Sequence, residues 1–146
     1  MKLSSLAVAI AALALAGAAV AHTDEYLDTV QAPNGGQLRM AGSYHYELVV
    51  GAEGAGAQER TLVVYVTDHG DAKLDTAGAE GGVVILSQGK KTKADLRPDG
   101  ENRLRGVATF APAPDMKVVV AVRLAGQPPA QARFVPLKPR PAPAAR

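Results

Sequence analysis

His45 and Glu47 occupy alternate positions of the stretch SYHYELVV, which spans residues 43–50. Two side chains at positions i and i+2 of a β-strand project from the same face, so both can reach a single metal ion. Met40 precedes them by a short turn, and a thioether beside an imidazole suits copper better than zinc or calcium. These three residues are a candidate copper site. The alternative interpretation is an ordinary strand face, on which a His and a Glu are common.

His69 and His22 extend the set of metal-capable side chains. His69 lies in TDHGDA between two aspartates, where a polar turn connecting two strands is the simpler explanation. His22 would become the first residue of the mature chain if the segment before it is removed. Its α-amine and imidazole would then chelate Cu(II) as the first half of a histidine brace, with His45 or His69 supplying the second imidazole. Chance placement of a His at this position is the competing interpretation.

The segment before His22 has the pattern of a secretory signal peptide. One basic residue precedes a long run of Ala, Leu, Val and Ile, and the segment ends in the small-x-small motif Ala19-Val20-Ala21. The apolar run has the length of a signal-peptide core and lacks a stop-transfer flank. We therefore expect residues 1–21 to be removed on export to the periplasm, with no membrane insertion after cleavage.

The composition narrows the classes of partner and reaction. The chain has 16 Lys and Arg against 14 Asp and Glu, and residues 1–21 contain only Lys2 among these, so the mature chain is nearly neutral. This balance argues against nucleic acid and anionic membranes as partners, because both need a clustered basic surface. Cysteine is absent, which excludes thiolate metal sites and thiol nucleophiles. The sequence contains no nucleophile elbow, metalloprotease helix motif or phosphate-binding glycine loop, so we expect no enzymatic activity.

The apolar pattern of the mature chain has a period of two, which is typical of β-strands. In KKTKADLR, charged residues lie on one face and Thr92, Ala94 and Leu96 on the other. Turns rich in Gly, Pro, Asp and Asn separate the predicted strands. These strands cover residues 36–41, 44–51, 60–67, 82–88, 90–97, 103–110, 116–124 and 130–135. Seven or eight short strands at this spacing predict an all-β fold, specifically an antiparallel, immunoglobulin-like β-sandwich.

The sandwich is expected to span residues 34–135, between two flanking segments. Residues 22–33 are polar and weakly patterned, and the sequence leaves open whether they form a flexible arm or lie along a sheet edge. The tail, residues 136–146, contains four prolines and is expected to be disordered. Docking of this tail onto a partner is the alternative.

The pair Gly42-Ser43 predicts a two-residue hairpin loop, with Gly at the positive-φ first position of a type II′ turn. The predicted register pairs Ala41 with Tyr44, Met40 with His45, and Leu38 with Glu47. The core face of the second strand would then carry Tyr44, Tyr46, Leu48 and Val50. His45 and Glu47 would face outward, with Met40 beside them.

Four stretches together resemble a family of small exported β-rich proteins: PNGGQLRMAGSYHYELVV, LVVYVTDHGDAKLDTAGAEG, GKKTKADLRPDGENRLRG and DMKVVVAVRL. A similar module occurs in periplasmic adaptor subunits of heavy-metal efflux pumps, and the resemblance covers residues 33 to about 124. It implies a role in resistance to copper or related metals, an efflux or other envelope protein as partner, and His45 and Glu47 as site residues. The chain departs from the family pattern at Asn34, where many relatives have His, and it lacks the helical hairpin of an adaptor subunit.

Two functions follow from these observations. The preferred one is periplasmic metal handling or metal stress, with weak copper binding through His45, Glu47 and Met40, helped by His22 or His69. The alternative is a metal-free interaction module that docks onto an envelope partner by a strand edge or by the Pro-rich tail.

Overall fold

The computed structural model describes residues 22–142, which form eight antiparallel strands and one short helix. The predicted all-β fold is confirmed, and each predicted strand has an observed counterpart. The strands are β1 (Gln37–Ala41), β2 (Tyr44–Val50), β3 (Gln58–Asp68), β4 (Glu80–Ser87), β5 (Lys90–Pro98), β6 (Arg103–Phe110), β7 (Lys117–Arg123) and β8 (Ala130–Phe134), and the helix is α1 (Asp24–Thr29). The predicted signal peptide lies outside the described residues.

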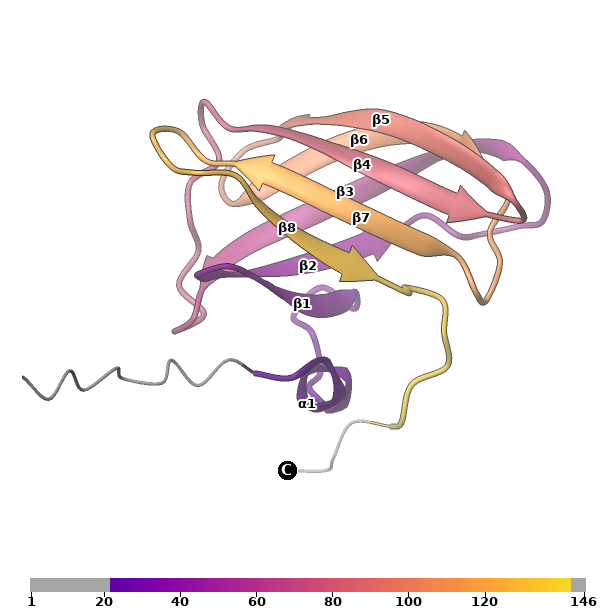
Figure 1. The fold of residues 1–146 in the computed structure, drawn as a ribbon, viewed down its shortest axis with the longest axis horizontal. Coiled ribbons are helices and arrows are strands. Elements are labelled where there is room, and N and C mark those ends of the chain that lie inside the picture. Colours follow the sequence, from indigo (N-terminus) through magenta and orange to yellow (C-terminus); the bar gives the residue numbers. More distant parts are fainter. Residues whose placement is uncertain (1–21, 143–146) are drawn as a thin grey trace, which may run out of the picture.

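The eight strands belong to one strongly curved sheet. They are hydrogen-bonded in the order β1-β2-β3-β6-β5-β4-β7-β8, and Figure 1 shows the sheet curling so that β8 comes to lie beside β1. At this seam the side-chain carbonyl of Gln37 accepts a hydrogen bond of 2.9 Å from the backbone N–H of Val135. The sheet is therefore nearly closed, and its two edge strands are neighbours.

The core fills the space that the curved sheet encloses. Alternate strand residues point into it, as the period of two predicts, and its fully buried members include Leu62, Val64, Ile85, Leu104 and Val120. Tyr46 is also fully buried, and its hydroxyl donates toward the carbonyl oxygens of Val122 at 3.4 Å and Ala130 at 3.2 Å. Burial raises the pKa of the Tyr46 phenol, so this hydroxyl stays protonated and joins β2 to β7 and β8 across the core.

The β1–β2 hairpin has the predicted register. Met40 pairs with His45, and Leu38 pairs with Glu47. Gly42 has a φ of 58°, as the first position of the predicted turn requires, and only glycine adopts this conformation without a steric cost. The hairpin therefore presents His45, Glu47 and Met40 on one face.

The β5–β6 junction has the fewest paired residues in the sheet. Only Arg97 with Arg105 and Pro98 with Leu104 are in register there. Gly106 follows directly, and a Cβ on this residue would lie 2.7 Å from the carbonyl oxygen of Asp95, closer than packing allows. A residue without a side chain is therefore required where the two halves of the sheet meet.

The helix α1 packs beside β1 and was not predicted. Oγ1 of Thr23 accepts a hydrogen bond of 3.2 Å from the backbone N–H of Tyr26 and so caps the helix. Leu27 is buried on the inner side of α1, and Asp28 binds the buried Arg39 of β1 at 2.8 Å. These contacts hold the segment 22–33 against β1 (Figure 1).

Residues 136–142 follow β8 and contact the start of β1. Leu137 packs against the core, and Nη1 of Arg140 donates a hydrogen bond of 3.1 Å to the carbonyl oxygen of Gly36. This part of the tail, for which the composition predicts disorder, thus has defined contacts, whereas residues 143–146 lie outside the described residues.

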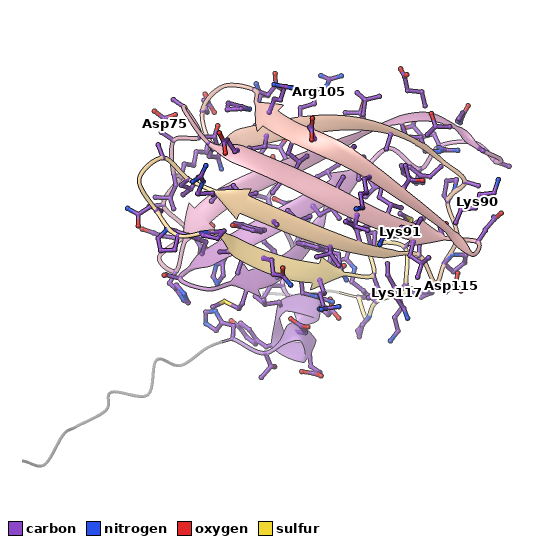
Figure 2. The ribbon with its side chains drawn as sticks, turned by 45° about the horizontal axis from the view of Figure 1, so that its top comes forward. Asp75, Lys90, Lys91, Arg105, Asp115 and Lys117 are labelled. Carbon is purple, nitrogen blue, oxygen red and sulfur yellow. The ribbon has the colours of Figure 1, made fainter. Side chains whose placement is uncertain are left out.

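The outer surface carries most of the charged side chains. Figure 2 shows Lys90, Lys91, Asp115 and Lys117 gathered at one end of the sheet, apart from Asp75 and Arg105. Within residues 22–142, no helix has the length and apolar character needed to cross a membrane.

Candidate functional site

The predicted site residues of β2 lie on the face of the strand that turns away from the core. The predicted face is confirmed, but the predicted solvent exposure is wrong, because His45 is only 5% exposed and Glu47 only 3% exposed. Segments distant in the sequence cover this face: the chain before β1 on one side and the turn at residues 68–73 on the other. His45 therefore lies in a partly enclosed site, not on an open strand surface.

His45 contacts both of the other histidines. Nδ1 of His22 lies 3.4 Å from Nε2 of His45, and the centroids of these two rings are 5.5 Å apart. The ring of His69 lies with its centroid 5.2 Å from that of His45. The three imidazoles come from the segment before α1, from β2 and from the turn after β3, and we call His22, His45 and His69 the histidine cluster.

The two facing nitrogens of His22 and His45 have a separation that suits one shared metal ion. Imidazole nitrogens bind transition metals at roughly 2.0 Å, so two of them on one ion lie about 2.8 Å apart at right angles and about 4.0 Å apart in line. The observed 3.4 Å lies between these limits. The separation of the two nitrogens is therefore compatible with one shared ion.

Asp71, whose side chain is 87% exposed, lies near the second ring nitrogen of His45. Oδ1 of Asp71 lies 3.5 Å from Nδ1 of His45. A carboxylate at this position favours the tautomer that carries its proton on Nδ1, which leaves the lone pair of Nε2 directed toward His22. This arrangement is the common one for a metal-binding histidine with a supporting carboxylate.

The turn after β3 places both His69 and Asp71. Oδ1 of Asp68 accepts hydrogen bonds from the backbone N–H groups of Gly70 at 2.8 Å and Ala72 at 2.9 Å, which fixes the turn. Asp71 itself has a φ of 63°, a left-handed conformation that Asp and Asn tolerate better than most residues. Asp71 was not predicted as a site residue, although its position two residues after His69 in TDHGDA was a usable signal.

The protonation state of His45 follows from its surroundings. Burial lowers the pKa of its imidazole below the usual 6.5, and the neighbouring His69 and His22 lower it further, while Asp71 acts in the opposite direction. The ring is therefore neutral at pH 7, which is the form that binds metal ions.

Met40 completes this face of the hairpin. It lies directly opposite His45 in the β1–β2 register and is partly exposed. Side chains at such paired positions have Cβ atoms about 5 Å apart, so the thioether can approach an ion bound at His45. Met40 is therefore a candidate soft ligand at the edge of the histidine cluster.

The carboxylate of Glu47 makes a different set of contacts. Its Oε1 accepts hydrogen bonds from the backbone N–H groups of Asn34 at 2.8 Å and Gly36 at 3.1 Å, and its Oε2 accepts one of 2.8 Å from Nδ2 of Asn34. These three hydrogen bonds hold the turn before β1, so the structure directs this carboxylate toward the turn and away from the histidine cluster.

A cavity of about 510 Å³ lies beside the cluster. Its wall includes Glu47 and Asp71 as well as the charged residues Lys73, Glu101 and Arg103. None of the three histidines is among its lining residues.

Among residues 22–142, no group of three or more His, Cys, Asp or Glu side chains is arranged so that it could hold a metal ion. His69 is exposed and His22 is partly exposed, so both can change rotamer without disturbing the core.

Comparisons with protein-family models, with curated proteins and with solved structures gave no match for this chain. The resemblance to efflux-adaptor modules therefore stays a prediction from the sequence, and the site is interpreted from its geometry.

Proposed function

We propose that this protein is an exported, periplasmic copper-binding protein that acts in metal handling or metal stress, with the histidine cluster as its binding site. The observation that supports this most strongly is the approach of Nδ1 of His22 to within 3.4 Å of Nε2 of His45, with the ring of His69 alongside. The contact between His22 and His45 requires a proton on one of the two facing nitrogens, and release of that proton would free both nitrogens for one ion.

The chemistry of the side chains favours copper over other metals. Imidazole binds Cu(II) more strongly than it binds the other divalent ions of the first transition row. A thioether such as that of Met40 is a ligand for Cu(I). The carboxylate of Asp71 supports the ring of His45 and so raises its basicity as a ligand. Oxygen-rich sites, which calcium and magnesium prefer, would need several carboxylates in place of these rings.

Partial exposure of the cluster fits exchange of copper rather than permanent storage. His69 is exposed and its ring must move to complete the coordination, which weakens binding and leaves a face open to a second protein. We therefore propose a metal-efflux or other envelope protein as the partner that delivers or receives the ion.

Titration with Cu(II) and with Cu(I), followed by calorimetry, tests this function. The protein is exported and processed in a bacterial host, and its first residue is identified by mass spectrometry. We expect one copper ion per chain and a loss of at least about tenfold in Cu(I) affinity for His69→Ala, an exposed substitution that should leave folding intact. Lys91→Ala, an exposed change on β5 (Figure 2), is the control. Absence of copper binding by folded wild-type protein would refute the proposal.

The alternative function, docking onto a partner by strand addition, has less support. The edge strands β1 and β8 lie against each other, and Gln37 is bonded to Val135 across the seam. A partner strand would first have to separate them.

The finer description of the fold also remains a proposal. We propose an immunoglobulin-like sandwich in which β1, β2, β3 and β6 form one layer and β5, β4, β7 and β8 form the other. The small number of residue pairs at the β5–β6 junction supports a division at this point. An experimental structure in which these layers face each other about 10 Å apart would test it.

A further inference from the structure

We propose that the backbone α-amine of His22 is itself a copper ligand, so that the Cu(II) site is completed only when residues 1–21 are removed. This inference rests on the proposed copper function of the histidine cluster. It adds a nitrogen ligand that belongs to the main chain, and it links metal binding to processing of the exported chain.

The orientation of the His22 ring carries the inference. The atom that faces His45 is Nδ1, at 3.4 Å from Nε2. In a histidine at the start of a chain, Nδ1 and the α-amine can bind one ion together and close a six-membered chelate ring. Nε2 lies on the far side of the ring and cannot do so. The structure therefore presents the one nitrogen that permits chelation, and presents it to the second imidazole.

The segment that carries His22 is held in place. The ring of His22 lies against that of Tyr26 on α1, with centroids 5.1 Å apart. The next residue, Thr23, caps α1, and α1 is fixed to β1 through the pair of Asp28 and Arg39. The main-chain nitrogen of His22 is thus attached to a positioned helix end, which reduces the entropy lost when it binds an ion.

The second imidazole, that of His45, also has a defined neighbour. Asp71 lies 3.5 Å from Nδ1 of His45, which favours a lone pair on Nε2, the nitrogen that faces His22. Three nitrogen ligands, namely the α-amine, Nδ1 of His22 and Nε2 of His45, suit the tetragonal geometry of Cu(II). His69 and Met40 then lie beside this set as additional ligands for Cu(I), which has no need of the amine.

The sequence contains a cleavage motif that would release the α-amine of His22. Ala19-Val20-Ala21 is a cleavage motif, and cutting after it makes His22 the first residue. In the uncut precursor the same nitrogen is an amide, which does not bind copper without losing its proton. Cu(II) binding would therefore be a property of the exported, processed protein and not of its precursor.

Acetylation of the α-amine separates this inference from the proposed function. The processed protein is acetylated near pH 6.5, where lysine side chains are protonated and react little, and mass spectrometry confirms a single modification at His22. We expect the Kd for Cu(II) to rise at least about 100-fold, because a chelating ligand is lost, while the Kd for Cu(I) changes less than about threefold. The electron paramagnetic resonance spectrum of bound Cu(II) should also lose one nitrogen coupling.

Two controls make the outcome decisive. His22→Ala keeps a free α-amine without the imidazole ring and should weaken Cu(II) binding in the same way, and thermal unfolding should show that neither protein has lost its fold. Equal Cu(II) affinity with and without acetylation would overturn this inference and leave the histidine cluster as the site. Folded protein that binds neither Cu(II) nor Cu(I) in any form would overturn the proposed function and this inference together.

Discussion

Asn34 and Glu47 are joined by two hydrogen bonds of 2.8 Å, one from the backbone N–H of Asn34 and one from its side-chain amide. The resemblance drawn from the sequence implies a His at this position in many relatives. In this chain the position binds a carboxylate instead. Both residues are therefore part of the frame that holds β1 against β2, and the proposed metal binding depends on the histidine cluster.

Glu47→Gln should destabilise the protein without removing copper binding. The substitution places an amide N–H against the Asn34 amide, which breaks one of three hydrogen bonds to a buried charge and costs about 1.5–3 kcal/mol. Urea unfolding measures this loss, and Glu59→Gln, an exposed change on β3, should cost almost nothing. Calorimetry should show copper affinity within about threefold of wild type. A larger loss of affinity would show that Glu47 is a ligand after all.

Asp71→Asn should weaken copper binding through the orientation of His45. Asn tolerates the left-handed φ of 63° at this position, so the turn is retained. Loss of the carboxylate beside Nδ1 of His45 removes the support of that ring, and copper affinity should fall about 10–100-fold. Asp115→Asn, in the exposed β6–β7 loop, is the matched control (Figure 2). Unchanged affinity and an unchanged metal spectrum would contradict the orienting role.

The ionised carboxylate of Asp28 should stabilise the folded protein, and this stabilisation should be lost at acid pH. Burial acts to raise the pKa of this carboxyl, but the hydrogen bond and charge of Arg39 outweigh burial and hold the pKa below its usual 3.8. A carboxyl with a lowered pKa stabilises the folded state above pH 3.8, and this contribution is lost as the pH falls below that value. Asp28→Asn should therefore be less stable than wild type by about 1 kcal/mol at pH 6, and the difference should shrink near pH 2.5.

Thermal unfolding of both proteins between pH 2.5 and pH 6 measures this difference, and Asp115→Asn serves again as the reference. A gap between wild type and Asp28→Asn that is constant over the whole range would show that the Asp28–Arg39 contact contributes nothing to acid sensitivity.

Gly106→Ala should destabilise the sheet far more than Gly82→Ala. A Cβ at 106 would lie 2.7 Å from the carbonyl oxygen of Asp95, so β5 and β6 must separate, at a cost of about 1–3 kcal/mol. A Cβ at 82 would meet its nearest atom, the carbonyl oxygen of Ala94, at an ordinary 3.5 Å. Chemical unfolding of the two variants gives the comparison, and equal stabilities would mean that the junction adapts to a side chain.

The strands and the hairpin register could be predicted because both depend on local patterns. Alternation of apolar residues marks each strand, and Gly42-Ser43 sets the pairing of Met40 with His45. The six-residue helix α1 was missed because it is too short for helical periodicity, although Thr23 followed by two acidic residues is a capping signal.

The burial of His45 and Glu47 could not be predicted, since the residues that cover them come from other parts of the chain. The convergence of the three histidines could not be predicted for the same reason. The positions of residues 22, 45 and 69 depend on how α1 and the 68–73 turn pack, and strand periodicity carries no information on this packing. The closure of the sheet likewise depends on its accumulated twist and not on any one segment.

The hydrogen bond between Gln37 and Val135 joins positions 98 residues apart. Contacts of such long sequence separation form slowly, because most of the chain must be ordered before its ends can meet. β1 therefore gains its second neighbour only when β8 is available, and β1 is the strand that supports both Met40 and α1. If the protein is exported and binds copper as we propose, a chain still emerging on the far side of the membrane would have no fixed frame for its three histidines until the last strand is in place.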